Sequence, residues 1–193
     1  GSELFTGHTM FLTLGVKAGT ISQSQMWAIL PQTWMGNLLG SVFVALLYCW
    51  GSGSLLPVDS SLVHTVALAK TSQSAMALFF KGALCNWLVC LAIWMAIRTE
   101  GAAKFIAIWW CLLAFIASGY EHSVANMTLF ALSWFGHHSD AYTLAGIGHN
   151  LLWVTLGNTL SGVVFMGLGY WYATPKSERP APEKTNETES LAQ

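Results

Sequence analysis

The residues best suited to chemistry lie in the segment 117–126, which reads Ala-Ser-Gly-Tyr-Glu-His-Ser-Val-Ala-Asn. It places the Glu121 carboxylate, the His122 imidazole and the Asn126 amide inside a hydrophobic stretch that spans residues 105–135. Ionisable groups are costly at the depth of a lipid bilayer, so they tend to mark the path of an ion or a proton. Because the ordinary pKa of histidine is about 6.5, His122 can offer a proton or a hydrogen bond near neutral pH. The sequence therefore predicts a functional centre at this segment.

A small anion is the partner that this chemistry favours. A bare anion costs roughly tens of kcal/mol in a medium of low dielectric constant, and neutralisation is its usual escape. A helix break at residues 119–123 would leave backbone N–H groups free, and the positive end of the helix dipole would attract an anion there. Our hypothesis is that the anion then shares a proton with His122. Glu121 is expected to be a structural acceptor for Lys70 or Asn86, because a free carboxylate in the path would repel the substrate.

The elements that must hold this centre are membrane helices. Hydrophobic residues make up 54% of the 193 residues and charged residues only 9%, a balance that indicates a membrane protein. Apolar runs long enough to cross a bilayer occur at residues 34–50, extendable back to residue 26, at 75–97 and at 147–172. The run 4–16 is too short to cross alone, and the run 105–135 is too long and carries its polar group midway. Both are predicted to be parts of broken helices.

The distribution of basic residues predicts the orientation. The net charge is only −1, which indicates no nucleic-acid partner. One side of the predicted spans carries Lys17, Arg98, Lys104, Lys176, Arg179 and Lys184. The other side carries only Lys70 and Lys81, so the positive-inside rule makes the richer side cytoplasmic and places the loops 51–74 and 136–146 outside. Residues 1–173 are predicted to form the transmembrane domain, and residues 174–193, with prolines and alternating charges, a disordered cytoplasmic tail.

Two parts of the chain resemble each other. The dipeptide Gly-Asn at 36–37 and at 157–158 opens a run of small residues, and each copy follows a broken segment at a similar distance. Glu3 stands opposite Glu121 in the same comparison. These pairs predict two antiparallel units, the inverted repeat of many transporters, with the glycines allowing close helix packing. The counterpart of the span 75–97 would lie before residue 1, so the chain is expected to be a fragment.

Several stretches carry a resemblance to a known family. They are Glu-Leu-Phe-Thr-Gly at 3–7, Lys-Gly-Ala-Leu-Cys-Asn-Trp-Leu-Val-Cys at 81–90, Gly-Tyr-Glu-His-Ser-Val-Ala-Asn-Met at 119–127, and Lys70. Over residues 1–172 the chain resembles the formate/nitrite transporter family, and within it the bacterial nitrite transporters. The resemblance implies an all-α membrane protein with an aquaporin-like inverted repeat, two broken helices and six spans, of which this chain lacks the first and half of the second. It also implies a homopentamer with one substrate path in each protomer.

The same resemblance implies roles for particular residues. The cytoplasmic-side constriction would consist of Leu4, Phe5 and Thr6, on the loop that breaks the first helix, and Val89. Phe115 would belong to the other constriction, and His122 would stand between the two, facing Thr6. The matching polar network consists of Lys70, Asn86, Glu121 and Asn126. His8 departs from the family pattern, which commonly has asparagine there, and this difference concerns the fine chemistry of the first broken helix.

These observations predict transport of nitrite, or a similar small monovalent anion, across the bacterial inner membrane, with protons and the lipid bilayer as further partners. No cofactor and no metal is expected. Conduction of formate, hydrosulfide or a neutral small solute on the same fold stays open, because pore radii decide that selectivity. A membrane enzyme with metal ligands would need more ionisable residues at depth than Glu121 and His122. A purely structural subunit is the third alternative.

Overall fold

Helices make up all of the regular structure that is described. The computed structural model describes residues 3–51, 62–136 and 138–179, and no strand occurs in these ranges. In chain order the helices are α1 (Phe5–Ala18), α2 (Gln23–Gly51), α3 (Leu62–Thr71), α4 (Ala75–Arg98), α5 (Ala102–Ala117), α6 (Ser123–Phe135), α7 (Leu144–Leu160), the π-helix η1 (Ser161–Leu168), α8 (Gly169–Ala173) and the 3₁₀ turn η2 (Lys176–Glu178). The prediction of an all-α fold is confirmed.

Three helical segments are long and apolar enough to cross a membrane. They are α2, α4 and the continuous run Leu144–Ala173, which is formed by α7, η1 and α8. The predicted spans 26–50, 75–97 and 147–172 all fall inside these segments. Large apolar side chains along α2 and α5 stay exposed in the single chain, and surfaces of this kind call for a lipid or protein partner.

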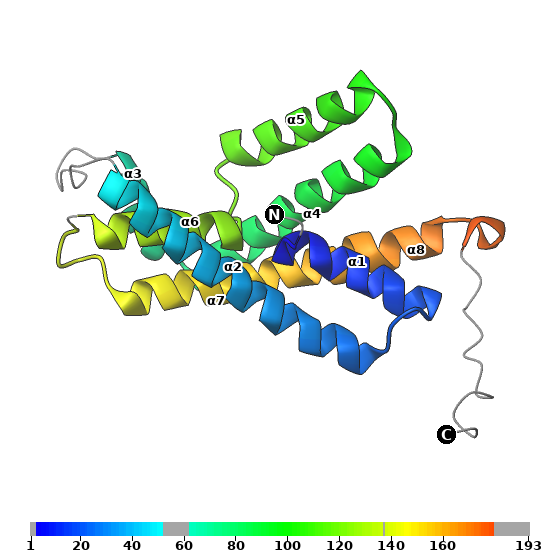
Figure 1. Cartoon of the computed structure of the whole chain (residues 1–193), viewed down its shortest axis with the longest axis horizontal. Coiled ribbons are helices and arrows are strands. Elements are labelled where there is room, and N and C mark those ends of the chain that lie inside the picture. Colours follow the sequence, from blue (N-terminus) through cyan, green and yellow to red (C-terminus); the bar gives the residue numbers. More distant parts are fainter. Residues whose placement is uncertain (1–2, 52–61, 137, 180–193) are drawn as a thin grey trace.

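The long apolar stretch 105–135 is broken as predicted. α5 ends at Ala117 and α6 begins at Ser123. Between them Gly119 has a φ of +65°, a left-handed conformation that glycine adopts without a steric penalty. Figure 1 shows α1 and α6 nearly in line, pointing away from each other from a shared centre. The N-terminal ends of two half-helices therefore meet in the middle of the bundle.

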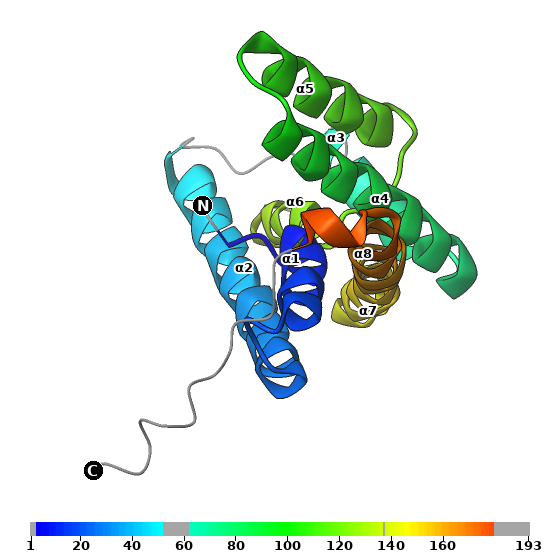
Figure 2. The same cartoon turned by 90° about the vertical axis from the view of Figure 1, so that its right-hand side faces the viewer.

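The remaining helices pack in pairs around this centre. α4 packs along α7 and α5, α2 along α6, and α1 against η1. Figure 2 shows α4 and α5 on one side of the bundle and α2 on the other. The contact of α4 with α7 depends on glycine, since a Cβ atom at Gly82 would lie 2.8 Å from the Val154 carbonyl oxygen and one at Gly157 would collide with the Phe79 backbone. A Cβ atom at Gly36 would meet nothing within 4 Å, so the close packing expected there is not made among the described residues.

Two elements differ from the sequence expectation. The helix α3, 10 residues long, lies within the predicted outer loop 51–74 and packs against α6 and α7. Its apolar run is too short to cross a bilayer, so a search for spans misses it. Residues 52–61 of that loop lie outside the described residues. The π-helix η1 was also missed, because it changes the hydrogen-bond register of the last span and leaves its composition apolar.

The start of the predicted tail folds back onto the last span. The Arg179 Nε atom donates to the Thr174 carbonyl oxygen at 2.9 Å, and a terminal nitrogen of the same side chain donates to the Tyr172 carbonyl oxygen at 3.2 Å. Residues 180–193 lie outside the described residues. The boundary at residue 173 and the disorder beyond it stay predictions.

Candidate functional site

His122 and Thr6 meet where the two half-helices begin. The Thr6 hydroxyl oxygen lies 3.3 Å from His122 Nε2, and the two residues are 0% and 6% exposed. Thr6 lies in the first turn of α1, and His122 is the N-cap of α6. The structure thus brings Thr6, predicted for one constriction, to face His122, the arrangement that the family resemblance implied.

The His122 ring also fixes the start of α6. Its Nδ1 atom accepts a hydrogen bond from the Ala125 N–H at 3.2 Å, the arrangement of an N-cap side chain. An imidazole nitrogen that accepts carries no proton, so the neutral ring holds its proton on Nε2, the atom that faces Thr6. The Phe115 ring lies beside it, with ring centroids 5.8 Å apart. The cap therefore determines both the tautomer and the direction of the available N–H group.

The backbone at this break is held by Asn158, a fully buried residue of α7. The Ser123 N–H donates to Asn158 Oδ1 at 3.0 Å, and Asn158 Nδ2 donates to the Glu121 carbonyl oxygen at 3.1 Å and to the Gly82 carbonyl oxygen at 2.8 Å. The Glu121 N–H reaches the Lys81 carbonyl oxygen. The expectation that the N–H groups between residues 119 and 123 stay free is therefore wrong for four of the five residues. The N–H groups of Gly119, Tyr120 and Glu121 donate to backbone carbonyl oxygens, and that of Ser123 donates to a side-chain amide oxygen.

Asn37 holds the other break in the same way. The Phe5 N–H donates to Asn37 Oδ1 at 2.9 Å, and Asn37 Nδ2 donates to the Glu3 carbonyl oxygen at 2.8 Å. In both breaks one asparagine amide bonds the carbonyl of a glutamate and the N–H two residues later. The repeated residues Asn37 and Asn158 therefore make equivalent hydrogen bonds at the two helix breaks.

Glu121 is the centre of a buried polar network. The residue is 1% exposed. Its Oε2 atom lies 2.9 Å from Lys70 Nζ and accepts a hydrogen bond from Asn126 Nδ2 at 2.6 Å. Its Oε1 atom accepts from Gln73 Nε2 at 3.1 Å, and Lys81 Nζ in turn donates to Gln73 Oε1 at 2.6 Å. Both carboxylate oxygens are occupied, so Glu121 acts as a structural acceptor, with Lys70 as its counter-ion.

Asn86 ties the helix breaks to α4 and is not a partner of Glu121. It is fully buried. Its Nδ2 atom lies within hydrogen-bond distance of the Thr6 carbonyl oxygen (3.2 Å), the Thr9 hydroxyl (3.1 Å) and the Asn158 carbonyl oxygen (2.7 Å). Of the two partners considered for Glu121, only Lys70 makes the contact.

The apolar residues of the predicted path fall into two groups. Leu4 and Val89 line one cavity of about 400 Å³ between α1, α4 and α5, which also reaches Lys104. Val89 packs in one cluster with Phe115. Phe5 contacts a different cluster, formed with residues of α2. The structure therefore gathers Leu4, Val89 and Phe115 near the centre and turns Phe5 toward α2.

A second polar cluster joins α3, α6 and the loop after α6. His64 Nδ1 lies 2.8 Å from the Ser133 hydroxyl, and its Nε2 lies 3.3 Å from the Ser139 hydroxyl. The Tyr142 hydroxyl donates to the Phe130 carbonyl oxygen at 3.1 Å, and burial raises the pKa of this phenol well above its ordinary value. Across the described ranges, no group of three or more His, Cys, Asp and Glu could hold a metal ion.

Sequence reasoning missed Asn37, Asn158 and Gln73 as site residues. The Gly-Asn repeat did mark both asparagines, but a repeat shows that two positions are equivalent and leaves their partners open. Gln73 carries no comparable signal, because a single amide between α3 and α4 has no periodicity or repeat.

Comparisons with known proteins agree with this geometry. The model of the family described as "Formate/nitrite transporter" matches residues 1–172. The "Nitrite transporter NirC" of Salmonella typhimurium is 88% identical over 100% of this chain and 71% of its own length. A solved "FNT family ion channel" superimposes with a TM-score of 0.88 and 91% identity, over 91% of this chain and 70% of its own. A solved "Pentameric formate channel with formate bound" superimposes with a TM-score of 0.72 and 27% identity, over 89% of this chain and 74% of its own.

Membrane spans around two half-helices that begin at a shared polar centre define a multi-pass membrane transport protein. The chain belongs to the formate/nitrite transporter family. These relatives are named as transporters and channels, so the prediction of a transport protein and not an enzyme is confirmed.

Proposed function

We propose that the protein carries nitrite across the bacterial inner membrane through a path in each protomer of a homopentamer, and that His122 shares a proton with the anion. The observation that carries the proposal is the buried Thr6–His122 pair at the junction of α1 and α6. A hydroxyl, an imidazole and two helix N-termini converge there inside an apolar bundle, and each of these groups favours an anion.

The cavity between α1, α4 and α5 is the entrance in this proposal. Lys104 contributes a positive charge to its lining, and Leu4 and Val89 contribute apolar groups. The charge attracts a small anion, whereas the apolar groups disfavour an ion that keeps its full hydration shell. The anion therefore exchanges water for protein donors as it reaches the centre.

At the centre, the donors are the Thr6 hydroxyl and the His122 Nε2–H. Because Nδ1 already accepts from the Ala125 N–H, a hydrogen bond from Nε2–H to the anion needs no rearrangement of the ring. A second proton on Nδ1, taken up as the pH falls, would break the cap of α6, so the transport rate depends on pH through the His122 ring. In the neutral ring the proton on Nε2 is shared along the Nε2···anion hydrogen bond and returns to Nε2 when the anion leaves.

The neighbouring acid does not oppose this step. Glu121 lies next to His122 in the chain, but its charge is balanced by Lys70 at 2.9 Å and its oxygens accept from Gln73 and Asn126. A free carboxylate would repel an arriving anion. The paired carboxylate instead fixes the backbone that presents the imidazole.

Nitrite is favoured over formate by the degree of similarity. The relative named as a nitrite transporter is 88% identical to this chain, whereas the solved formate channel is 27% identical. That formate channel is described as pentameric, which supports a homopentamer here. The basic residues at one end of the molecule support a cytoplasmic C-terminus.

Uptake of nitrite into proteoliposomes tests the proposal. The full-length pentamer and a His122→Phe variant are compared at several pH values, with and without an imposed proton gradient. Loss of a hydrogen bond to a charged group is expected to lower the rate by roughly tenfold to a hundredfold, and the remaining rate should no longer depend on pH.

The matched control is His138→Phe, a histidine that stacks on Trp134 outside the proposed path. Its nitrite uptake should equal that of the parent protein. Unchanged uptake and unchanged pH dependence in His122→Phe would contradict the role of His122. Faster uptake of formate than of nitrite by the parent protein would contradict the choice of substrate.

A further inference from the structure

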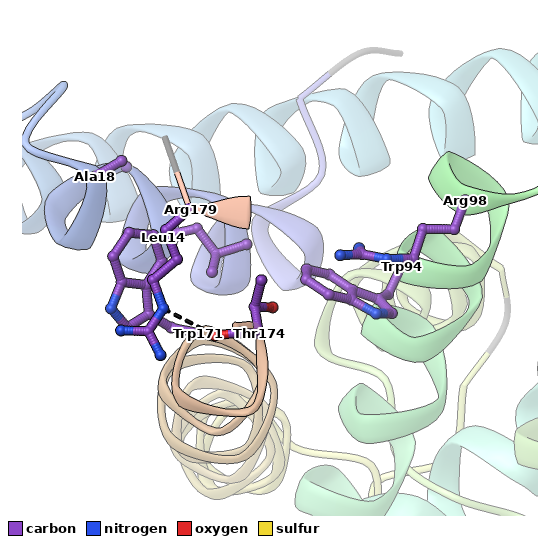
Figure 3. A pocket seen from close by; sticks show the side chains of 8 residues that line it. Leu14, Ala18, Trp94, Arg98, Trp171, Thr174 and Arg179 are labelled. Carbon is purple, nitrogen blue, oxygen red and sulfur yellow. Dashed lines mark hydrogen bonds between the residues drawn. The ribbon is translucent and has the colours of Figure 1, made fainter. Parts of the chain in front are cut away.

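A pocket at the basic end of the molecule lies apart from the proposed path. It is a cavity of about 290 Å³ lined by residues of α1, α4, α8 and the segment that follows α8. Figure 3 shows Arg98 and Arg179 on two sides of this pocket, each near a tryptophan ring, with Thr174 between them. Nothing in the proposed transport step uses these residues.

The Arg98 guanidinium stacks on an aromatic ring, which leaves its hydrogen-bond donors free. The central carbon of its guanidinium lies 3.7 Å from the centroid of the Trp94 ring. Its side chain makes no hydrogen bond or ion pair with the part of the chain that the structure describes. A guanidinium stacked on an indole leaves its edge donors free, and that edge matches the oxygens of a carboxylate or phosphate.

Arg179 is fixed in place from the other side. Its hydrogen bonds to the carbonyl oxygens of Thr174 and Tyr172 use two of the five guanidinium N–H groups. The central carbon of its guanidinium lies 5.4 Å from the centroid of the Trp171 ring. Lys17 adds a third positive charge nearby, since its Nζ atom lies 3.5 Å from the Tyr172 hydroxyl.

These three cations have no acidic partner among the described residues. The ion pairs recorded there join Glu3 to His8 and Glu121 to Lys70, away from this pocket. Positive charges gathered without a counter-ion repel one another. A bound anion would remove this repulsion, and the guanidinium groups favour a phosphate because they can bind two of its oxygens at once.

The apolar walls of the pocket indicate that the phosphate it would bind belongs to a lipid with acyl chains. Trp94, Trp171 and Leu14 line it together with the arginines. Tryptophans at the ends of spans mark the level of the lipid head groups, and basic pockets between membrane helices bind the head groups of anionic lipids. A small soluble anion would leave the indole and leucine surfaces without a partner.

We infer that this pocket binds the phosphate of an anionic phospholipid, with Arg98 and Arg179 as its ligands. The lipid joins the C-terminal ends of α1, α4 and α8. This proposal does not depend on the transported substrate, since its residues lie outside the path.

Lipid binding to the delipidated full-length pentamer tests the inference. Native mass spectrometry would compare phosphatidylglycerol, phosphatidylcholine and glycerol phosphate on the parent protein and on Arg98→Gln, Arg179→Gln and the double variant. At about fivefold per arginine near a membrane surface, phosphatidylglycerol should bind about 25-fold more weakly to the double variant. Lys176→Gln, a basic residue at the same end that does not line the pocket, should bind the lipid like the parent.

Three results would overturn the inference. Equal binding of phosphatidylcholine would remove the role of the anionic head group, and equal binding of glycerol phosphate would show a site for soluble phosphates. An equal loss in Lys176→Gln would show diffuse surface attraction. Arg98→Gln decides the question even if Arg179→Gln fails to fold, because Arg98 makes no hydrogen bond within the described chain.

Discussion

A buried carboxylate is stable only while its partners hold it, and Glu121 has three of them. Removing Lys70 would leave a carboxylate that is 1% exposed without a counter-ion, whereas removing Glu121 would leave a lysine that is 17% exposed. Loss of one partner of a buried ion pair costs about 3–5 kcal/mol. We therefore predict that Lys70→Met destabilises the protein by about this amount and Glu121→Gln by less, measured by detergent-induced unfolding of the pentamer.

The double variant separates the ion pair from the packing around it. In Lys70→Met/Glu121→Gln no buried charge remains, and the new amide oxygen can still accept one of the two hydrogen bonds that Gln73 and Asn126 donate to the carboxylate. The double variant should be more stable than Lys70→Met alone. Lys81→Met is the control, because this half-buried lysine contacts only the outer part of the network, and it should cost less than about 1 kcal/mol. Strict additivity of the two single substitutions would count against the pairing.

The two half-helices depend on one asparagine each, and the asparagines differ in burial. Asn158 is fully buried and makes hydrogen bonds to Ser123, Glu121 and Gly82, whereas Asn37 is partly exposed and makes two. A buried polar group left without a partner costs about 1–3 kcal/mol. We predict that Asn158→Leu lowers stability and nitrite uptake more than Asn37→Leu does, measured by unfolding in mixed micelles and by proteoliposome flux.

Asn158→Asp is the matched control for this prediction. The aspartate keeps an acceptor for the Ser123 N–H but sets a buried charge without a counter-ion against the Glu121 and Gly82 carbonyl oxygens, so it should lower stability at least as much as Asn158→Leu does. Equal losses of stability and uptake in Asn37→Leu and Asn158→Leu would show that the burial of the asparagine does not determine the size of the effect.

Comparison of the helices with the sequence shows which features a single chain reveals. Long apolar runs predict α2 and α4, and a polar group inside an apolar run predicts the break before α6. Both signals are visible in the sequence because polar groups are costly in lipid. The contacts of Asn158 could not be predicted, since they join Gly82 and Glu121 across long sequence separations. α3 was missed because ten residues of mixed polarity meet no length criterion.

The single chain leaves much apolar surface uncovered. Among the described contacts, α5 packs mainly along α4, and its residues Phe105, Trp109 and Ile116 are largely exposed. Figure 1 shows α5 standing away from α1 and α2. In the proposed homopentamer, lipid and neighbouring protomers cover such faces, so stability depends on assembly and on the membrane.

The basic end of the molecule gives the last prediction, which concerns orientation. The pocket shared by α1, α4 and α8 brings Arg98 and Arg179 to one end, and the positive-inside rule predicts that this end is cytoplasmic. In spheroplasts, a membrane-impermeant maleimide should label Asp140→Cys, in the loop between α6 and α7, and should label Ser177→Cys only after lysis. Both positions are exposed.

The parent protein is the control for labelling, since the native cysteines 49, 85, 90 and 111 are all buried. Labelling of Ser177→Cys in unbroken spheroplasts, with protection of Asp140→Cys, would contradict the predicted orientation and show the opposite one. The cavity that reaches Lys104 would then open to the outside, and nitrite would first meet this cavity from the opposite side of the membrane.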